Sequence, residues 1–136
     1  MKRIVILIII FMFSCQKEDK NNQFIKSNQF VYAPGIYYHK QIKIIIKEFN
    51  DGSLIYGIAD KLNNIIYQQN INQSFSNNSN WFLFIDQNDN IWFFTSDLQL
   101  TTVLIKENET YEYKKIAKNS NEIPNEMKAK IESITN

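Results

Sequence analysis

The stretch at residues 81–94 is apolar on both faces of a hairpin, and its sequence is WFLFIDQNDNIWFF. Alternate residues of a strand point to opposite sides of a sheet, and here both alternating sets are aliphatic or aromatic. Residues 86–90 supply the polar turn between the two halves. Because a strand that is apolar on both sides has to be covered on both sides, we expect this hairpin to be the buried centre of a layered β fold.

Short apolar runs separated by turn residues continue along the chain. Asn50-Asp51-Gly52-Ser53 is a strong hairpin signal, because Asp and Gly tolerate positive φ. Before it, isoleucines alternate with lysines over 42–47, as in a strand with one buried face. The pattern predicts strands at 30–32, 36–49 with an interruption near His39-Lys40, 54–59, 65–69, 81–85, 91–95, 98–105 and 111–116.

The end of the chain has a different period. Pro124 suits the first turn of a helix, and Met127, Ile131 and Ile134 follow at the spacing of one helical face. We expect a helix over 124–134 that lays this stripe on the sheet. The predicted fold is mainly β, an antiparallel meander of about eight strands in a small barrel or sandwich, with a short C-terminal helix.

The N-terminus has the pattern of an export signal. Lys2 and Arg3 precede an unbroken apolar run of ten residues, Ile4 to Phe13. As a helix this run would cover about 15 Å, half of the roughly 30 Å hydrocarbon core of a bilayer. An export signal is therefore favoured over a resident transmembrane helix.

The apolar run ends at Ser14-Cys15, and Cys15 is the only cysteine. This junction resembles the lipobox of bacterial lipoproteins, in the looser form common in Bacteroidetes. The resemblance implies that the Cys15 thiol is lipidated, that residues 1–14 are removed, and that two or three acyl chains hold the protein in a membrane. The alternative is an ordinary secretory signal, with Cys15 as an incidental thiol.

The next four residues, Gln16, Lys17, Glu18 and Asp19, resemble the lipoprotein export signal of Bacteroidetes, a lysine followed by two acidic residues. The resemblance implies a place on the outer face of the outer membrane; the alternative is an outer-membrane position that faces the periplasm. The chain then divides into a signal peptide at 1–14, a lipidated flexible tether at 15–27, and one β-rich domain at 28–136.

Composition narrows the function. Arg3 is the only arginine, and removing residues 1–14 lowers the formal charge from +1 to −1, so nucleic-acid binding is not expected. His39 is the only histidine, which leaves little for metal or nucleophilic catalysis. Asp86, Asn88, Asn90 and Asp97 have the spacing of calcium ligands, but Ile91 replaces the required glycine, and a plain turn is favoured. We expect no enzyme, no metal and no cofactor.

A binding function remains. The expected protein is an outer-membrane lipoprotein that acts as a non-enzymatic binding or accessory module, with a membrane partner through its lipid and a protein or glycan ligand. The alternative is an immunity or inhibitor lipoprotein that neutralises a toxin, with residues 70–90 as the contact region. Candidate ligand contacts are Trp81, Trp92 and Phe75, whose rings suit a sugar or a peptide.

Overall fold

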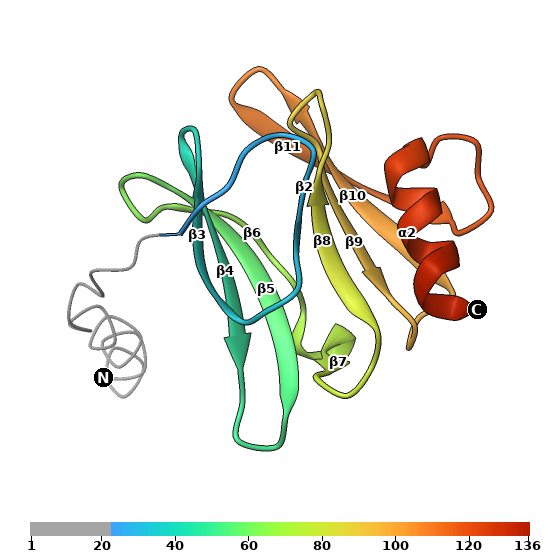
Figure 1. The fold of residues 1–136 in the computed structure, drawn as a ribbon. Helices are drawn as coiled ribbons and strands as arrows, with labels where there is room; N and C mark the ends of the chain where they lie inside the picture. The colour runs from blue at the N-terminus through green and yellow to red at the C-terminus, as the bar shows by residue number, and fades with distance from the viewer. Residues whose placement is uncertain (1–22) are drawn as a thin grey trace.

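The computed structural model describes residues 23–136, and within them the chain forms two β-sheets and a C-terminal helix (Figure 1). All the predicted strands are present, including the break after His39, and the sequence pattern missed the two short strands β1 and β7. The elements are β1 (Gln23–Phe24), β2 (Gln29–Val31), β3 (Gly35–His39), β4 (Ile42–Glu48), β5 (Ser53–Asp60), β6 (Ile65–Gln68), η2 (Ile71–Gln73), β7 (Phe75–Ser76), β8 (Trp81–Ile85), β9 (Ile91–Thr95), β10 (Leu100–Glu107), β11 (Thr110–Ala117) and α2 (Asn125–Thr135).

The first sheet has the order β1-β3-β4-β5-β6, with β7 also paired to β5. The second sheet has the order β11-β10-β9-β8-β2. Neighbouring strands are antiparallel except for β1, which runs parallel to β3. The mainly antiparallel prediction is therefore confirmed, and the two sheets form a sandwich (Figure 1).

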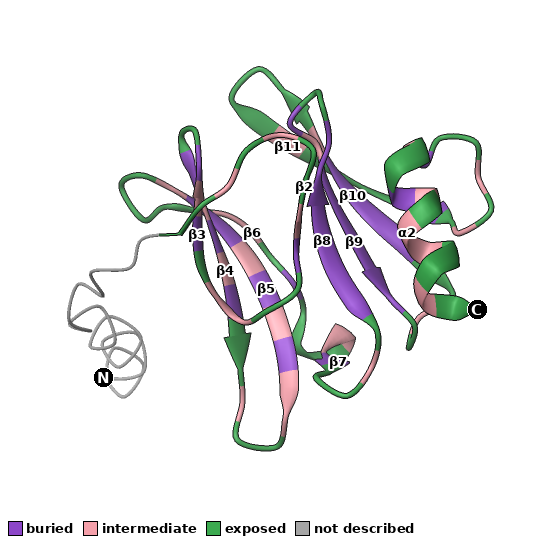
Figure 2. Cartoon of the chain, viewed as in Figure 1, coloured by how far each residue is buried: buried purple, intermediate pink, exposed green. Residues whose placement is uncertain are grey.

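The main core lies between the two sheets. Alternate residues of β4 and β5 point into it and are almost fully buried, as are those of β8 and β9 (Figure 2). Its aromatic members are Tyr37, Tyr56, Phe75, Trp81 and Phe93. Burial of this apolar area is the main driving force for the sandwich.

A second core lies between the second sheet and α2. Met127 of the helix is fully buried against the other set of side chains of the 81–94 hairpin, with Ile131 and Ile134 beside it. The residues that it joins are Phe82, Phe84, Trp92, Phe94, Val103, Ile116 and Ile123. All ten strand residues of this hairpin are buried, which confirms its central position.

The prediction of a flexible tether at 15–27 is wrong for residues 23–27, which belong to the fold. Gln23 and Phe24 pair with Tyr37 and Tyr38 of β3, and the Ile25 side chain packs against the main core. Two residues of strand give no sequence signal of their own, because tertiary pairing fixes them. The predicted boundary at residue 28 therefore falls inside the fold.

Candidate binding site

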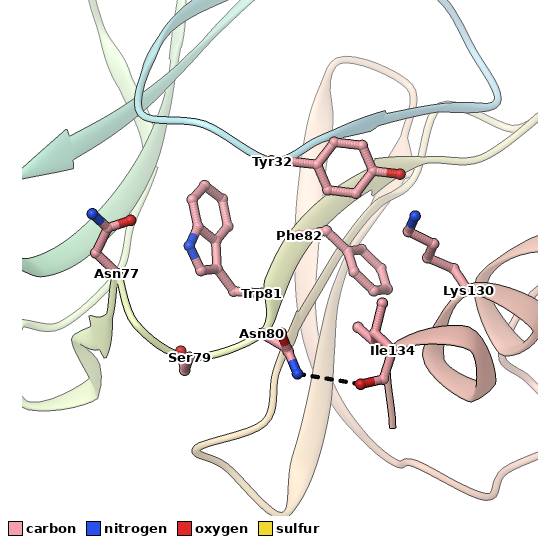
Figure 3. A pocket seen from close by; sticks show the side chains of 8 residues that line it. All are labelled: Tyr32, Asn77, Ser79, Asn80, Trp81, Phe82, Lys130 and Ile134. Atoms are coloured by element: carbon pink, nitrogen blue, oxygen red, sulfur yellow. Dashed lines mark hydrogen bonds between the residues drawn. The ribbon is translucent and has the colours of Figure 1, made fainter. Parts of the chain in front are cut away.

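A hollow of about 250 Å³ opens where the second sheet, α2 and the loop before β8 meet (Figure 3). It arises because β2 ends early: β2 pairs with β8 only at Leu83–Ile85, so Trp81 and Phe82 extend past it. The lining residues are Tyr32, Asn77, Ser79, Asn80, Trp81, Phe82, Lys130 and Ile134.

Hydrogen bonds fix the polar side of the hollow. The Asn80 side-chain amide donates to the Ile134 carbonyl of α2 at 3.3 Å, and its backbone pairs with Ser96 (Figure 3). The Ser79 hydroxyl donates to the Ser76 carbonyl at 2.6 Å, and Asn77 donates to Glu48 at 3.0 Å. Amide and hydroxyl groups are thus presented on a loop that is already ordered.

The aromatic side combines one exposed ring and one buried ring. Tyr32 is 52% exposed, and its ring stacks on Phe30 with centroids 6.0 Å apart. The Lys130 ammonium lies 4.7 Å from the Tyr32 ring centroid, a cation–π distance. Trp81 is only 7% exposed, so Tyr32 is the ring that offers surface to a ligand.

The three predicted ligand contacts do not form one platform. Trp81 lines the hollow, and Phe75 packs against it from within the core, with ring centroids 5.1 Å apart. Trp92 belongs to the second core, on the α2 side of the same hairpin. Its indole N–H donates to Asp86 Oδ2 at 2.9 Å, which satisfies its only polar group.

The Asp86 carboxylate is occupied by donors of its own turn. It accepts hydrogen bonds from the backbone N–H of Asn88 at 2.8 Å and of Asn90 at 3.0 Å, besides the Trp92 bond. Asp97, the fourth residue of the calcium-like spacing, instead accepts from the Ser76 N–H. Over residues 23–136 no group of three or more His, Cys, Asp or Glu side chains is arranged to hold a metal ion.

Sequence reasoning missed a buried ionic cluster around His39 and Asp89. His39 is only 3% exposed, and its ring contacts Asp89 of the 86–90 turn. Its Nε2 lies 2.9 Å from Asp89 Oδ1, and its Nδ1 lies 2.9 Å from the Ile25 carbonyl oxygen. Both oxygens can accept a hydrogen bond, so each ring nitrogen of His39 faces an acceptor.

Two further groups donate to Asp89. The Ser27 hydroxyl lies 2.7 Å from Oδ1, and the Lys40 ammonium lies 2.5 Å from Oδ2. Burial by itself would raise the pKa of Asp89, but the bonds from Lys40, Ser27 and His39 outweigh it and hold that pKa well below its ordinary value.

The cluster contains Ser, His and Asp but not in the order of a nucleophilic triad. Ser27 donates to the carboxylate, and the ring nitrogen that does not contact Asp89 is bonded to a backbone carbonyl. In a triad that nitrogen would accept the serine proton. The cluster instead ties the N-terminal segment and the β3–β4 turn to the 86–90 turn.

Cys15 and the Gln16–Asp19 signal lie outside the described residues. Within 23–136, no helix has the length and apolar character needed to cross a bilayer. Comparison of the chain with protein-family models, with curated proteins and with solved structures gave no match.

Proposed function

We propose that the protein is an outer-membrane lipoprotein, anchored through Cys15, that acts as a non-enzymatic binding module. The observation that carries the binding role is the hollow at Tyr32, which combines an exposed ring with amide and hydroxyl groups. A sugar ring has apolar C–H faces and hydroxyl edges, so this mixture matches a glycan chemically. The proposed ligand is therefore an extracellular glycan.

The anchor is tested by a Cys15→Ala variant and a Lys17-Glu18-Asp19→Ala variant expressed in a Bacteroidetes host. The first variant should lose incorporation of labelled fatty acid and leave the membrane fraction. The second should stay lipidated but become resistant to protease added to intact cells, while the unmodified protein is cut. Resistance of both proteins until lysis would place the domain on the periplasmic side.

The binding role is tested with Trp92→Phe, which leaves Trp81 as the only tryptophan of the chain. Because Trp81 lines the hollow, its fluorescence should change when a glycan fills it. Adding Tyr32→Ala should weaken binding at least about tenfold, since one stacked ring contributes about 1–3 kcal/mol. Tyr113→Ala on β11 is the matched control and should not alter binding; equal affinities in all three proteins would exclude this hollow.

A second candidate function is inhibition of a toxin, and the order of the loop before β8 favours it. Asn70 caps η2 through the Asn72 N–H, and the Ser76 N–H donates to Asp97. Ile71 lies on this ordered loop and is 63% exposed, so its side chain could insert into the active site of a toxin. Two results together would favour inhibition over glycan capture. A toxin gene would lie next to the gene of this protein, and the Ile71→Asp variant would no longer protect cells against that toxin.

A further inference from the structure

The outer face of the first sheet is left open by the described chain. Tyr37, Ile44, Ile58 and Tyr67 point into the main core, so the residues that alternate with them point outward. Helix α2 covers the corresponding face of the second sheet, whereas no described element lies over the first (Figure 2).

This open face is unusually apolar for exposed surface. Its strand positions include Phe24 at 75% exposed, Ile36 at 44% and Ile65 at 69%, with Ile45 and Ile55 between them. Gly57 lacks a side chain in the middle of the face, and a hollow of about 160 Å³ lies over it. Contiguous apolar surface of this kind on a soluble domain marks an interaction site.

The charges at the outward strand positions have one sign, since Lys43 and Lys47 of β4 point outward. The turn after β5 adds Lys61 beside Asp60, whose carboxylate accepts from the backbone N–H of Leu62, and Leu62 is 82% exposed. None of the outward strand positions in this part of the structure carries a carboxylate. Apolar and aromatic side chains flanked by lysines are the composition of surfaces that lie in the headgroup region of anionic membranes.

The chain enters the fold beside this face. Phe24 is the second described residue, and its ring lies 5.7 Å from that of Tyr38, centroid to centroid. Eight residue steps separate Cys15 from Gln23, and they span at most about 28 Å. A lipid on Cys15 would therefore keep the face close to a bilayer, at a high effective concentration.

We infer that the outer face of the first sheet docks on the bilayer that holds the lipid of Cys15. Phe24, Leu62 and Ile65 enter the headgroup boundary, and the lysines face anionic headgroups. The inference rests on the proposed lipidation. A second copy of the chain fits less well, because face-to-face packing would bring the lysines of the two copies together.

The experiment uses the full lipidated protein in vesicles of equal parts phosphatidylcholine and phosphatidylglycerol. Cys15 is the only native cysteine and its thiol would be acylated, so one introduced cysteine can be labelled selectively. A fluorophore sensitive to polarity is placed at Ile65→Cys on the open face. The matched control carries it at Glu126→Cys, an exposed position of α2.

We expect the Ile65 probe to shift to shorter wavelength and to be quenched by a lipid-borne quencher several times more strongly than the Glu126 probe. Raising the salt concentration should reduce this difference, because it screens the lysines. Equal quenching of both probes in protein that floats with the vesicles would overturn the docking inference and leave the anchor intact. If the Ile65 probe is shielded from water only at a high amount of protein per vesicle, the face binds a second copy of the chain instead. That result would also overturn the inference.

Flotation of the protein with the vesicles tests the proposed lipid anchor. If the protein does not float, the anchor is absent, and the proposed function fails before docking is addressed. Flotation and probe quenching thus separate the two failures.

Discussion

The His39 ring and the Asp89 carboxylate meet at 2.9 Å although fifty residues separate them in the sequence. The contact joins the end of β3 to the turn between β8 and β9, so it links the two sheets of the sandwich. Asp89 adopts a positive φ of 63°, and this turn conformation directs its side chain to His39 and Lys40.

Replacing Asp89 with Asn should lower the free energy of unfolding by about 2 kcal/mol, because a neutral amide would replace the charged acceptor of the bonds from Ser27, His39 and Lys40. Urea unfolding near neutral pH measures the loss. Asp51→Asn is the control, since the Asp51 carboxylate bonds only within its own exposed turn, to Ser53. A loss no larger than the control's would mean that the cluster does not stabilise the fold.

The same carboxylate predicts an acid dependence of stability. The folded pKa of Asp89 lies below the unfolded value of 3.8, so its contribution is complete above about pH 4 to 5 and is lost as the pH falls through the folded pKa. The difference in unfolding free energy between the unmodified protein and Asp89→Asn should therefore narrow at about pH 2.5. A difference that stays constant over this range would contradict the ionic role of Asp89.

The raised pKa of Tyr111 predicts how the stability of the fold changes at alkaline pH. Burial, and then the nearby Asp89 charge, raise the pKa of Tyr111 from 10.0 to about 12. A raised folded pKa stabilises the fold fully below pH 10, and this contribution is lost as the pH rises through the folded value. Tyr111→Phe should therefore lose less stability than the unmodified protein between about pH 10 and 12. The other tyrosines are common to both proteins, so parallel pH curves would refute the assignment.

Phe75→Ala should lower the unfolding free energy by about 4 kcal/mol, since a large buried side chain would leave a cavity. Phe75 is 2% exposed and contacts the rings of Trp81 and Phe93. The matched control is Ile71→Ala in the same loop, which should change stability little because Ile71 is 63% exposed. Equal thermal midpoints for the two variants would show that Phe75 is not part of the core.

Met127→Ala tests how α2 is held. Met127 is fully buried in the second core, and its truncation should lower stability by about 3 kcal/mol and increase hydrogen exchange in α2. Glu132→Ala, at an exposed position of the same helix, is the control. If both variants exchange alike, α2 is held by contacts other than its apolar stripe.

The sheet sandwich could be predicted because local signals agree with it. Asp51-Gly52 marks one hairpin, the polar residues 86–90 mark another, and the two-faced apolar pattern of 81–94 requires cover on both sides. Helical spacing also predicts that the stripe of Met127 lies on a sheet, and the structure shows that this is the second sheet. In each of these cases the information lies within a short continuous stretch of sequence.

The ionic cluster could not be predicted in the same way. His39 is flanked by tyrosines and a lysine, and Asp89 is one of several polar turn residues, so neither has a local pattern that points to the other. The bond between Trp92 and Asp86, in contrast, spans six residues and could have been anticipated from an aspartate that opens a turn. The hollow at Tyr32 depends on where β2 ends, which only the sheet pairing determines.

The parallel pairing of β1 with β3 has a mechanical consequence. A pull on the chain from before Gln23 is carried first by a two-residue edge pairing and then by the bonds that Ile25 and Ser27 make to His39 and Asp89. These are backed by the Asn28 N–H, which donates to the Ile85 carbonyl at 2.6 Å. A load applied before Gln23 would thus detach a short leading segment first, and the cluster around His39 and Asp89 would resist it before it reaches the rest of the sandwich.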